Sequence, residues 1–301
     1  MIVDAYSERY RDAFLQFCRI NRPYMDDSYL SEEELRSFQG GWQEPTFLLI
    51  DEDEAVIGAA SLIWNDFMRR QNRSRFRIFG CQAGDPEHYA LLWERVMRWT
   101  PDEITALFLF IPQESSDLRK RMAHLGFNIE RYSFLLERRQ QALSPVLWPP
   151  GYDLRQFRRG QDEQDVVDVR NAAFRRLQGS STPITTTSLE RLLDSVEHLA
   201  GGILLLYFKD TAVGVVRASR EWHRGSDWLY IGMLAVVPEH QGKGLGRMLL
   251  RAALATGEFH GLFNSLLTVN AENKQAVRLY LTEGFTVNNV MECWTYSLED
   301  S

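Results

Sequence analysis

The chain has 301 residues, of which 45% are hydrophobic, enough for one large or two ordinary globular cores. Its net charge of −7 argues against a general nucleic-acid binder, because such binding depends on neutralising phosphates with basic residues. No apolar run approaches the roughly 20 residues that span a bilayer, and residues 1–9 lack the apolar core of a signal peptide. We therefore expect a cytoplasmic protein without a membrane partner.

Three cysteines, Cys18, Cys81 and Cys293, are widely separated in the chain. They show neither the pairing of a disulfide framework nor the short spacing of metal ligands. The histidines are equally dispersed. We expect the cysteines to be reduced and structural, and we expect no metal cofactor.

The first half of the chain alternates helical and strand patterns. Helices are expected at residues 8–20, 31–38, 86–99 and 115–124, and strands at 46–50, 55–64, 75–79 and 104–111. A segment with three prolines then interrupts the pattern at residues 143–150, before Gly151. Such a composition predicts a stiff linker near the middle of the chain.

The second half repeats a similar order of elements. Strands are expected at residues 152–157, 203–208, 212–220, 229–237 and 266–270, and helices at 162–176, 187–196, from Gly244 onward, and at 273–280. Gly126-Phe127 in the first half corresponds to Gly284-Phe285 in the second. This echo indicates an internal repeat, with chance similarity of two α/β segments as the alternative.

The turn between residues 237 and 245 carries the strongest chemical signal. Gly242, Gly244 and Gly246 separate a buried strand from an amphipathic helix. A helix N-terminus presents unpaired N–H groups and partial positive charge, which suits a pyrophosphate. A P-loop is excluded because Gly244 follows Lys243, and the dinucleotide fingerprint fails at Arg247.

A second segment follows at the proper distance. Asn273, Ala276, Leu279 and Tyr280 lie on a short helix after the strand ending at Asn270. Ala276 and Leu279 are explained by core packing alone. Packing does not explain why Asn273 and Tyr280 accompany a phosphate-type turn.

Together the two segments resemble the GNAT superfamily of N-acetyltransferases. The family signature Gln-x-x-Gly-x-Gly is matched at residues 241–246, and Asn-x-x-Ala-x-x-Leu-Tyr-x-x-x-Gly-Phe at 273–285. The resemblance implies an α/β (α+β) fold with a mixed, mostly antiparallel sheet flanked by helices. It also implies acetyl-CoA as co-substrate and a small-molecule or peptide amine as acceptor.

The resemblance further implies roles for individual residues. Tyr280 is expected to donate the proton that the departing thiolate needs. The strand before the turn is expected to separate from the next strand, so that its backbone can bind the pantetheine arm. The residues expected to bind acetyl-CoA are Leu234, Ala235, Val236, Gln241, Gly242, Lys243, Gly244, Leu245, Gly246, Arg247 and Asn273.

The first copy lacks these features. Its corresponding turn is the segment 80–86, whose Asp85 would repel a pyrophosphate, while Met122 replaces Tyr280 and Ser115 replaces Asn273. We expect a degenerate GNAT-like domain at residues 1–142 and a catalytic domain at 151–301. Tandem GNAT proteins with one decayed copy, mycothiol synthase among them, are similar in architecture.

No general base is evident, because the strand at 229–234 contains no carboxylate. Glu221 and His223 are candidates, although a position in a solvated loop explains either residue better. Alternative functions are another acyl or aminoacyl transfer and a non-catalytic CoA-binding protein. Retention of Tyr280 favours catalysis.

The acceptor is expected to meet helices near residues 171–193 and loops from both halves. These segments carry no transferable motif.

Overall fold

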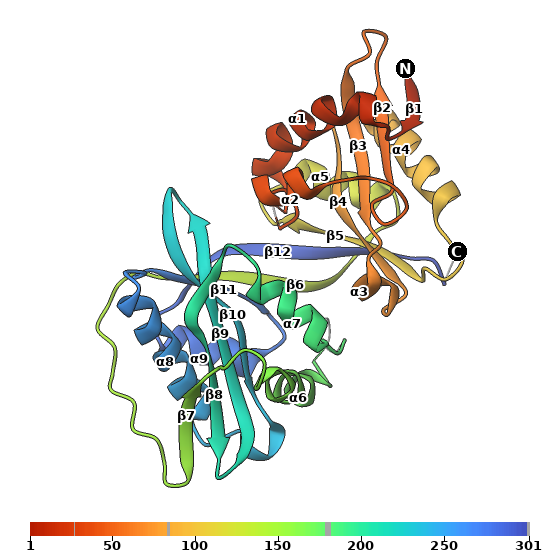
Figure 1. Cartoon of the computed structure of the whole chain (residues 1–301). Coiled ribbons are helices and arrows are strands. Elements are labelled where there is room, and N and C mark those ends of the chain that lie inside the picture. The colour runs from red at the N-terminus through yellow and green to blue at the C-terminus, as the bar shows by residue number, and fades with distance from the viewer. Residues whose placement is uncertain (27, 83–84, 178–181, 300–301) are drawn as a thin grey trace. The chain divides into compact units, whose positions relative to one another are not determined.

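The computed structural model describes residues 1–26, 28–82, 85–177 and 182–299. It divides into two compact units (Figure 1). Unit 1 contains Met1–Ser133 and Asn289–Ser301, and unit 2 contains Phe134–Asn288. Ala83 and Gly84 of the degenerate turn lie outside the described residues, as do residues 178–181 of the expected acceptor region.

Unit 1 is a mostly antiparallel sheet with helices on both faces. Its strands, in hydrogen-bonded order, are β1 (Ile2–Ala5), β2 (Thr46–Ile50), β3 (Val56–Ile63), β4 (Arg73–Cys81), β5 (Ala106–Pro112) and β12 (Thr286–Ser297). Its helices are α1 (Arg11–Asn21), α2 (Glu32–Ser37), α3 (Asp66–Arg69), α4 (Pro86–Trp99) and α5 (Ser116–His124). Helices α1 and α2 pack on one face, α4 and α5 on the other. Strands β4 and β5 pair in parallel, whereas the pairs β1–β2, β2–β3, β3–β4 and β5–β12 are antiparallel.

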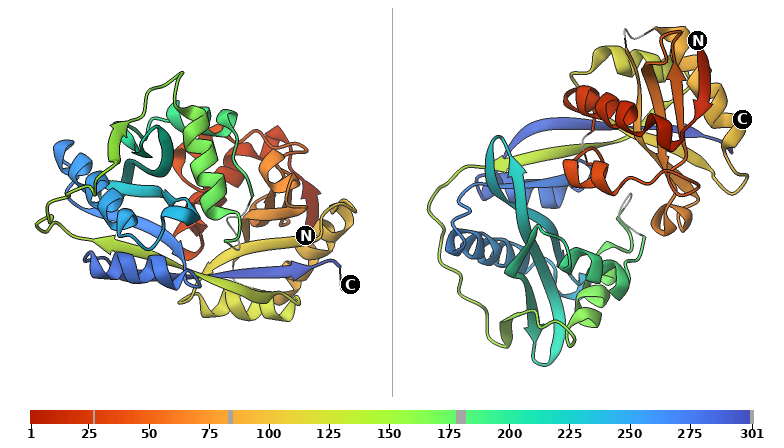
Figure 2. Two further views of the ribbon diagram at one scale, coloured as in Figure 1. Left: turned by 90° about the horizontal axis from the view of Figure 1, so that it is seen from below. Right: turned by 45° about the horizontal axis from the view of Figure 1, so that its top comes forward.

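Unit 2 follows the same plan. Its strands, in order, are β6 (Asn128–Arg138), β11 (Ser265–Asn270), β10 (Ser226–Val236), β9 (Thr211–His223), β8 (His198–Phe208) and β7 (Tyr152–Gln156). Its helices are α6 (Glu163–Phe174), α7 (Thr186–Leu193), α8 (Leu245–Phe259) and α9 (Lys274–Thr282). Figures 1 and 2 show α6 and α7 on one face of this sheet and α8 and α9 on the other. The predicted mixed, mostly antiparallel sheet is confirmed.

The packing of α8 positions the glycine turn. Leu245, Leu249 and Leu250 are buried on one side of this helix, as the periodicity predicts. Near its other end, Gly257 lies against Leu229 of β10, where a Cβ atom would approach Leu229 Cδ2 to 2.6 Å. The helix is therefore seated closely on the sheet, with its N-terminus at the end of β10.

The compact units differ from the division expected at residues 142 and 151, because two strands are shared between them. Leu136 near the end of β6 is fully buried in the core of unit 2. Cys293 and Trp294 in β12 are buried in the core of unit 1. Residues 143–150 form no regular element, yet Leu143 and Trp148 pack against the core of unit 2. As a division into ancestral repeats, residues 1–142 and 151–301 stay a prediction.

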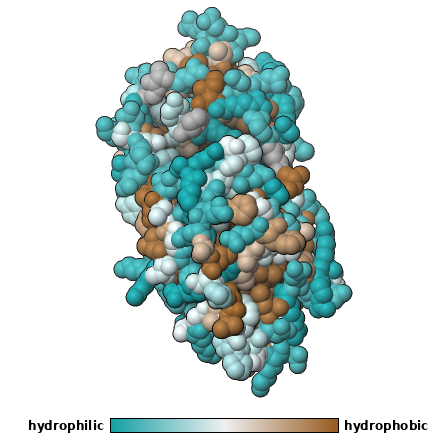
Figure 3. Space-filling model, turned by 90° about the vertical axis from the view of Figure 1, so that its left-hand side faces the viewer, coloured by the Kyte–Doolittle hydropathy of each residue, from teal (hydrophilic) through white to brown (hydrophobic). Residues whose placement is uncertain are grey.

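One side of unit 2 exposes apolar residues (Figure 3). Leu147 and Phe259 are 83% and 86% exposed. Between the segment from Leu143 to Trp148 and α8 lies a cavity of about 940 Å³.

Within the described part of the chain, no helix is long and apolar enough to cross a membrane.

Candidate active site

The glycine turn leaves a row of backbone donors unused. Gly242 and Gly244 have φ values of +75° and +79°, and a Cβ atom at either position would meet nothing within 4 Å. Gly244 is the N-cap of α8 and has no side chain to cap it. The backbone N–H groups of residues 242–246 donate to no described residue. An accessible helix N-terminus of this kind suits an anion such as a pyrophosphate.

Strands β10 and β11 separate as they approach the turn. Their parallel pairing consists of Leu229 with Ser265 and Tyr230 with Leu266. Beyond Tyr230, β10 remains paired only with β9, and a bulge lies between Ile231 and Met233. The edge of residues 231–236 that faces β11 is therefore open to an extended ligand.

A cavity of about 550 Å³ connects the open edge of β10 with the turn. The residues that line it are Ala173, Phe174, Arg176, Leu177, Leu234, Ala235, Val236, Gln241, Gly242, Gly244, Leu245, Gly246, Arg247, Asn273, Gln275, Ala276, Leu279 and Tyr280. Ten of the eleven residues expected to bind acetyl-CoA are in this set, together with Tyr280. The exception is Lys243, whose Nζ donates to the Glu239 carbonyl at 3.2 Å.

Several polar side chains at the cavity already have partners. Gln241 Nε2 donates to the Val236 carbonyl at 2.8 Å, which fixes the start of the turn. Arg247 Nε lies 3.1 Å from Glu283 Oε1. Asn273 Oδ1 accepts from the N–H of Ala276 and caps α9. These contacts shape the cavity wall.

Tyr280 is buried at the wall of the cavity. Its ring packs edge-on against Phe285, with ring centroids 5.8 Å apart. Its hydroxyl forms no hydrogen bond with a described residue. Burial, and to a smaller degree Tyr230, raises the pKa of Tyr280 to about 12. The phenol is therefore protonated at neutral pH and has a proton to donate.

Neither candidate base lies at the cavity. His223 Nε2 is 2.7 Å from Glu137 Oε1, and Arg224 lies 3.0 Å from the same carboxylate oxygen. Glu221 pairs across the sheet with Trp228. No described residue lining the cavity is an aspartate, glutamate or histidine. Nor do the described residues include a group of three or more that could hold a metal ion.

Sequence reasoning placed the helices near residues 171–193 at the acceptor pocket but named no individual residue of α6. Ala173, Phe174 and Arg176 line the cavity at the end of this helix, and Arg176 is exposed there. These three residues belong to no sequence motif, because tertiary packing brings the end of the helix to the cavity.

The corresponding place in unit 1 differs among the described residues. Beyond the three parallel pairs from Arg73 to Arg75, residues of β4 and β5 line a small cavity of about 10 Å³. Met25 and Phe110 are among the residues around it. Asp85 is the N-cap of α4, and its carboxylate accepts from the N–H of Glu87 at 2.9 Å. The helix terminus that is free in unit 2 is thus capped by a carboxylate in unit 1.

The chain is similar to known acetyltransferases. Residues 165–285 match the Acetyltransferase (GNAT) family. A mycothiol acetyltransferase of Acidimicrobium ferrooxidans is 30% identical over 189 residues, covering 61% of this chain and 60% of that protein. One of Thermobispora bispora is 34% identical over 173 residues, covering 54% and 56%. The matched stretches thus span little more than half the length of these curated relatives.

Solved structures extend the likeness to the whole chain. A GCN5-related N-acetyltransferase from Sphaerobacter thermophilus has a TM-score of 0.70 at 20% identity, covering 98% of this chain and 95% of that one. A tandem GNAT protein from the clavulanic acid biosynthesis pathway has a TM-score of 0.71 at 14% identity, covering 98% of both. At these identities the likeness concerns the fold. Residues 165–285 thus match the GNAT acetyltransferase family, and the paired units of the chain share the fold of a tandem GNAT protein.

Proposed function

We propose that the chain is an N-acetyltransferase that moves the acetyl group of acetyl-CoA directly to an amine of a small molecule or peptide. One observation carries the proposal: a single cavity contains both a free helix N-terminus and an unpartnered tyrosine hydroxyl. The first suits a pyrophosphate and the second suits a thiolate leaving group.

The residues at the cavity fit acetyl-CoA. The N–H groups of residues 242–246 would bind the pyrophosphate, because neither Gly242 nor Gly244 has a Cβ atom to keep it away. The open edge of Leu234, Ala235 and Val236 would pair with the pantetheine amides as a further strand would.

Cations and amides around the cavity complete the proposed binding site. Arg176 and Arg247 are exposed at the cavity and would attract the phosphates. Asn273 caps α9 through its oxygen, which leaves its side-chain nitrogen to donate. The proposed role of Lys243 is indirect, since its ammonium group braces the turn through Glu239.

Acetyl-CoA supplies an activated thioester. The acceptor nitrogen forms a bond to the acetyl carbon, the carbon–sulfur bond breaks, and the sulfur leaves with its electron pair. Tyr280 donates a proton to that sulfur, and the nitrogen releases one proton to water. Water is the proposed acceptor of this proton, because no described residue of the cavity wall is an aspartate, glutamate or histidine.

Unit 1 is proposed to have no acetyl-CoA site of its own. Its corresponding cavity is small, and Asp85 occupies the helix terminus where a phosphate would bind.

The three cysteines are free and buried, which suits the reducing cytoplasm. The curated relatives with the printed name mycothiol acetyltransferase are consistent with a small amine as acceptor.

The test is turnover. The full chain is incubated with acetyl-CoA and a panel of polyamines, aminoglycosides, aminosugar thiols, amino acids and peptides, and acetylated products are detected by mass spectrometry. We expect at least one amine to be acetylated with release of one free thiol per product. Binding of acetyl-CoA without any product would contradict the proposal and would favour a CoA-binding regulatory protein.

A further inference from the structure

Arg217 in β9 is a buried cation without a partner. Its side chain belongs to a residue that is 7% exposed, and its guanidinium forms no hydrogen bond or ion pair with any described residue. In unit 2 only residues 178–181 lie outside the description, and this Gln-Gly-Ser-Ser sequence contains no carboxylate. Burying an unpaired charge is costly, so such a group calls for an explanation.

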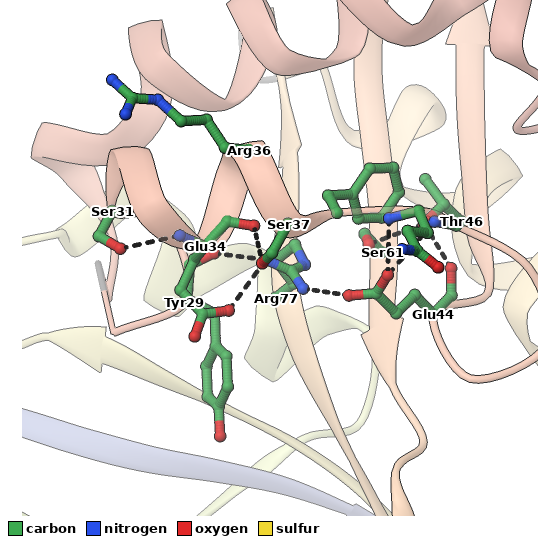
Figure 4. A network of polar contacts seen from close by, with 12 residues as sticks. Tyr29, Ser31, Glu34, Arg36, Ser37, Glu44, Thr46, Ser61 and Arg77 are labelled. Atoms are coloured by element: carbon green, nitrogen blue, oxygen red, sulfur yellow. Dashed lines mark hydrogen bonds and ion pairs between the residues drawn. The ribbon is translucent and has the colours of Figure 1, made fainter. Parts of the chain in front are cut away.

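A buried arginine of unit 1 shows the usual arrangement (Figure 4). Arg77 is 5% exposed, and its Nη1 donates to the Tyr29 carbonyl at 2.7 Å. It also forms ion pairs with Glu34 and Glu44. Arg77 therefore has bonded carboxylates and a bonded carbonyl around its guanidinium. Arg217 makes no such bond with a described residue, although the charge of Glu197 acts on it, and burial lowers its pKa.

Arg217 borders the bulge of β10. A Cβ atom on Gly232 would lie 2.8 Å from Arg217 Nη1 and 3.2 Å from Tyr230 Cε1. Gly232 is exposed, and a side chain at this position would force the Arg217 guanidinium to shift. The missing side chain therefore gives Arg217 access to the surface of the strand.

This position is close to the proposed reaction centre. Arg217 lies opposite Met233 in the sheet, next to Leu234 of the cavity wall. Tyr230 is near enough to Tyr280 to contribute to the raised pKa of its phenol. Arg217 therefore lies near the end of the cavity that is farther from the glycine turn.

We infer that Arg217 binds an anionic group of the acceptor, so that the preferred substrate is an amine that also carries a carboxylate or a phosphate. The inference rests on the proposed acetyltransferase function. A guanidinium forms two parallel hydrogen bonds with either oxyanion. Binding the anion supplies the missing partner of Arg217 and orients the amine toward Tyr280.

The test compares acceptors that differ only in the anion. Amino acids are paired with their amides, and O-phosphoethanolamine with ethanolamine, and kcat/KM is measured for each member. We expect the anionic member of at least one type of pair to be preferred by about 10- to 100-fold, the range of a charge-assisted hydrogen bond. The two types of pair distinguish a carboxylate from a phosphate. Equal kcat/KM for both members of every pair would overturn the inference.

Variants connect this preference to Arg217. Arg217→Met should reduce the preference to within about threefold, while the Kd of acetyl-CoA stays unchanged. The unfolding temperature should be unchanged or higher, because the variant removes an unpaired buried charge. Arg220→Met is the control, since Arg220 lies on the same strand but is paired with Asp227 at 2.5 Å. A preference that survives Arg217→Met, or a collapse of the fold on this substitution, would contradict the assignment.

A binding measurement separates this inference from the proposed function. The full chain is labelled with ¹⁵N-arginine and titrated with sodium acetate and with inorganic phosphate. We expect a saturable shift of one Nε–H signal that is absent from Arg217→Lys. If that shift occurs but no amine is acetylated, the anion site stands and the proposed function fails. If amines are acetylated but neither anion shifts the signal, the inference fails alone.

Discussion

Tyr280 combines a buried ring with an unpartnered hydroxyl, and this combination determines what its substitution should do. Burial raises the pKa of the phenol to about 12, so it keeps its proton throughout the neutral range. Tyr280→Phe should lower kcat by roughly 10- to 1,000-fold, within and just below the usual range for a lost general acid. The Kd of acetyl-CoA should hardly change, because the wall of the cavity is preserved.

The same substitution should leave the unfolding temperature almost unaltered, since the hydroxyl loses no hydrogen bond to a described residue. Steady-state kinetics with an identified acceptor, together with thermal unfolding, measure both effects. Turnover of Tyr280→Phe at the wild-type rate would show that the proton comes from elsewhere.

At the residue scale, the sequence predicted the site where function depends on local chemistry. The positive φ values of Gly242 and Gly244 and the helical position of Tyr280 follow from spacing within a short segment. Arg217 and Phe174 were not predicted, because their roles arise from neighbours distant in the sequence. The one visible sign of Arg217 was a charge within the otherwise apolar residues 212–218.

At the element scale, the carboxylate of Glu130 links the strands β4, β6 and β12. Arg73 of β4 donates to Glu130 Oε1 of β6 at 3.1 Å, and Thr295 Oγ1 of β12 donates to Glu130 Oε2 at 2.7 Å. Burial raises the pKa of Glu130, but these two partners outweigh it and lower the pKa to about 2. The ionised form is therefore stabilised by folding.

Because the folded pKa lies below the unfolded value of about 4.3, this stabilisation is present above pH 5 and is lost as the pH falls toward 2. Glu130→Gln should lower the free energy of unfolding by about 1–3 kcal/mol at pH 7, after allowance for solvent screening, and by less at pH 2.5. Urea denaturation at both pH values measures this. The control is Glu94→Gln in an exposed pair with Arg98, which should cost less than about 1 kcal/mol. An equal loss at both pH values would disprove the linkage.

Elements with a strong period were predicted and those without one were not. The apolar faces of α8 and α9 are evident in the sequence, and both helices form. Strand β6 was not predicted, because its buried and exposed positions do not alternate regularly. The strand pairing that separates β10 from β11 and the sharing of β6 and β12 are tertiary features, for which periodicity carries no information.

At the scale of the whole molecule, the shared strands determine which fragment can fold. A fragment of residues 151–301 would lack Leu136, which is fully buried in unit 2, and would expose Cys293 and Trp294. Removing a buried leucine alone costs about 2–5 kcal/mol. We expect this fragment to aggregate or to unfold at a clearly lower temperature than the full chain.

A fragment of residues 134–288 should behave better, because it follows the compact unit. We expect it to remain soluble and to bind acetyl-CoA, since all residues at the cavity are within it. Size-exclusion chromatography and thermal unfolding of the two fragments measure the difference. If residues 151–301 are as heat-stable as residues 134–288, the shared strands do not define the folding units.

The central claim is that the chain has one acetyl-CoA site, at the glycine turn of unit 2. Calorimetric titration of acetyl-CoA into the full chain tests it, together with Gly244→Val and the control Gly261→Val. Both glycines have positive φ and open space around a Cβ atom, so both substitutions carry similar strain. We expect one acetyl-CoA site per chain. Binding at this site should be lost in Gly244→Val and retained in Gly261→Val. Two equivalent sites, or unchanged binding to Gly244→Val, would contradict it.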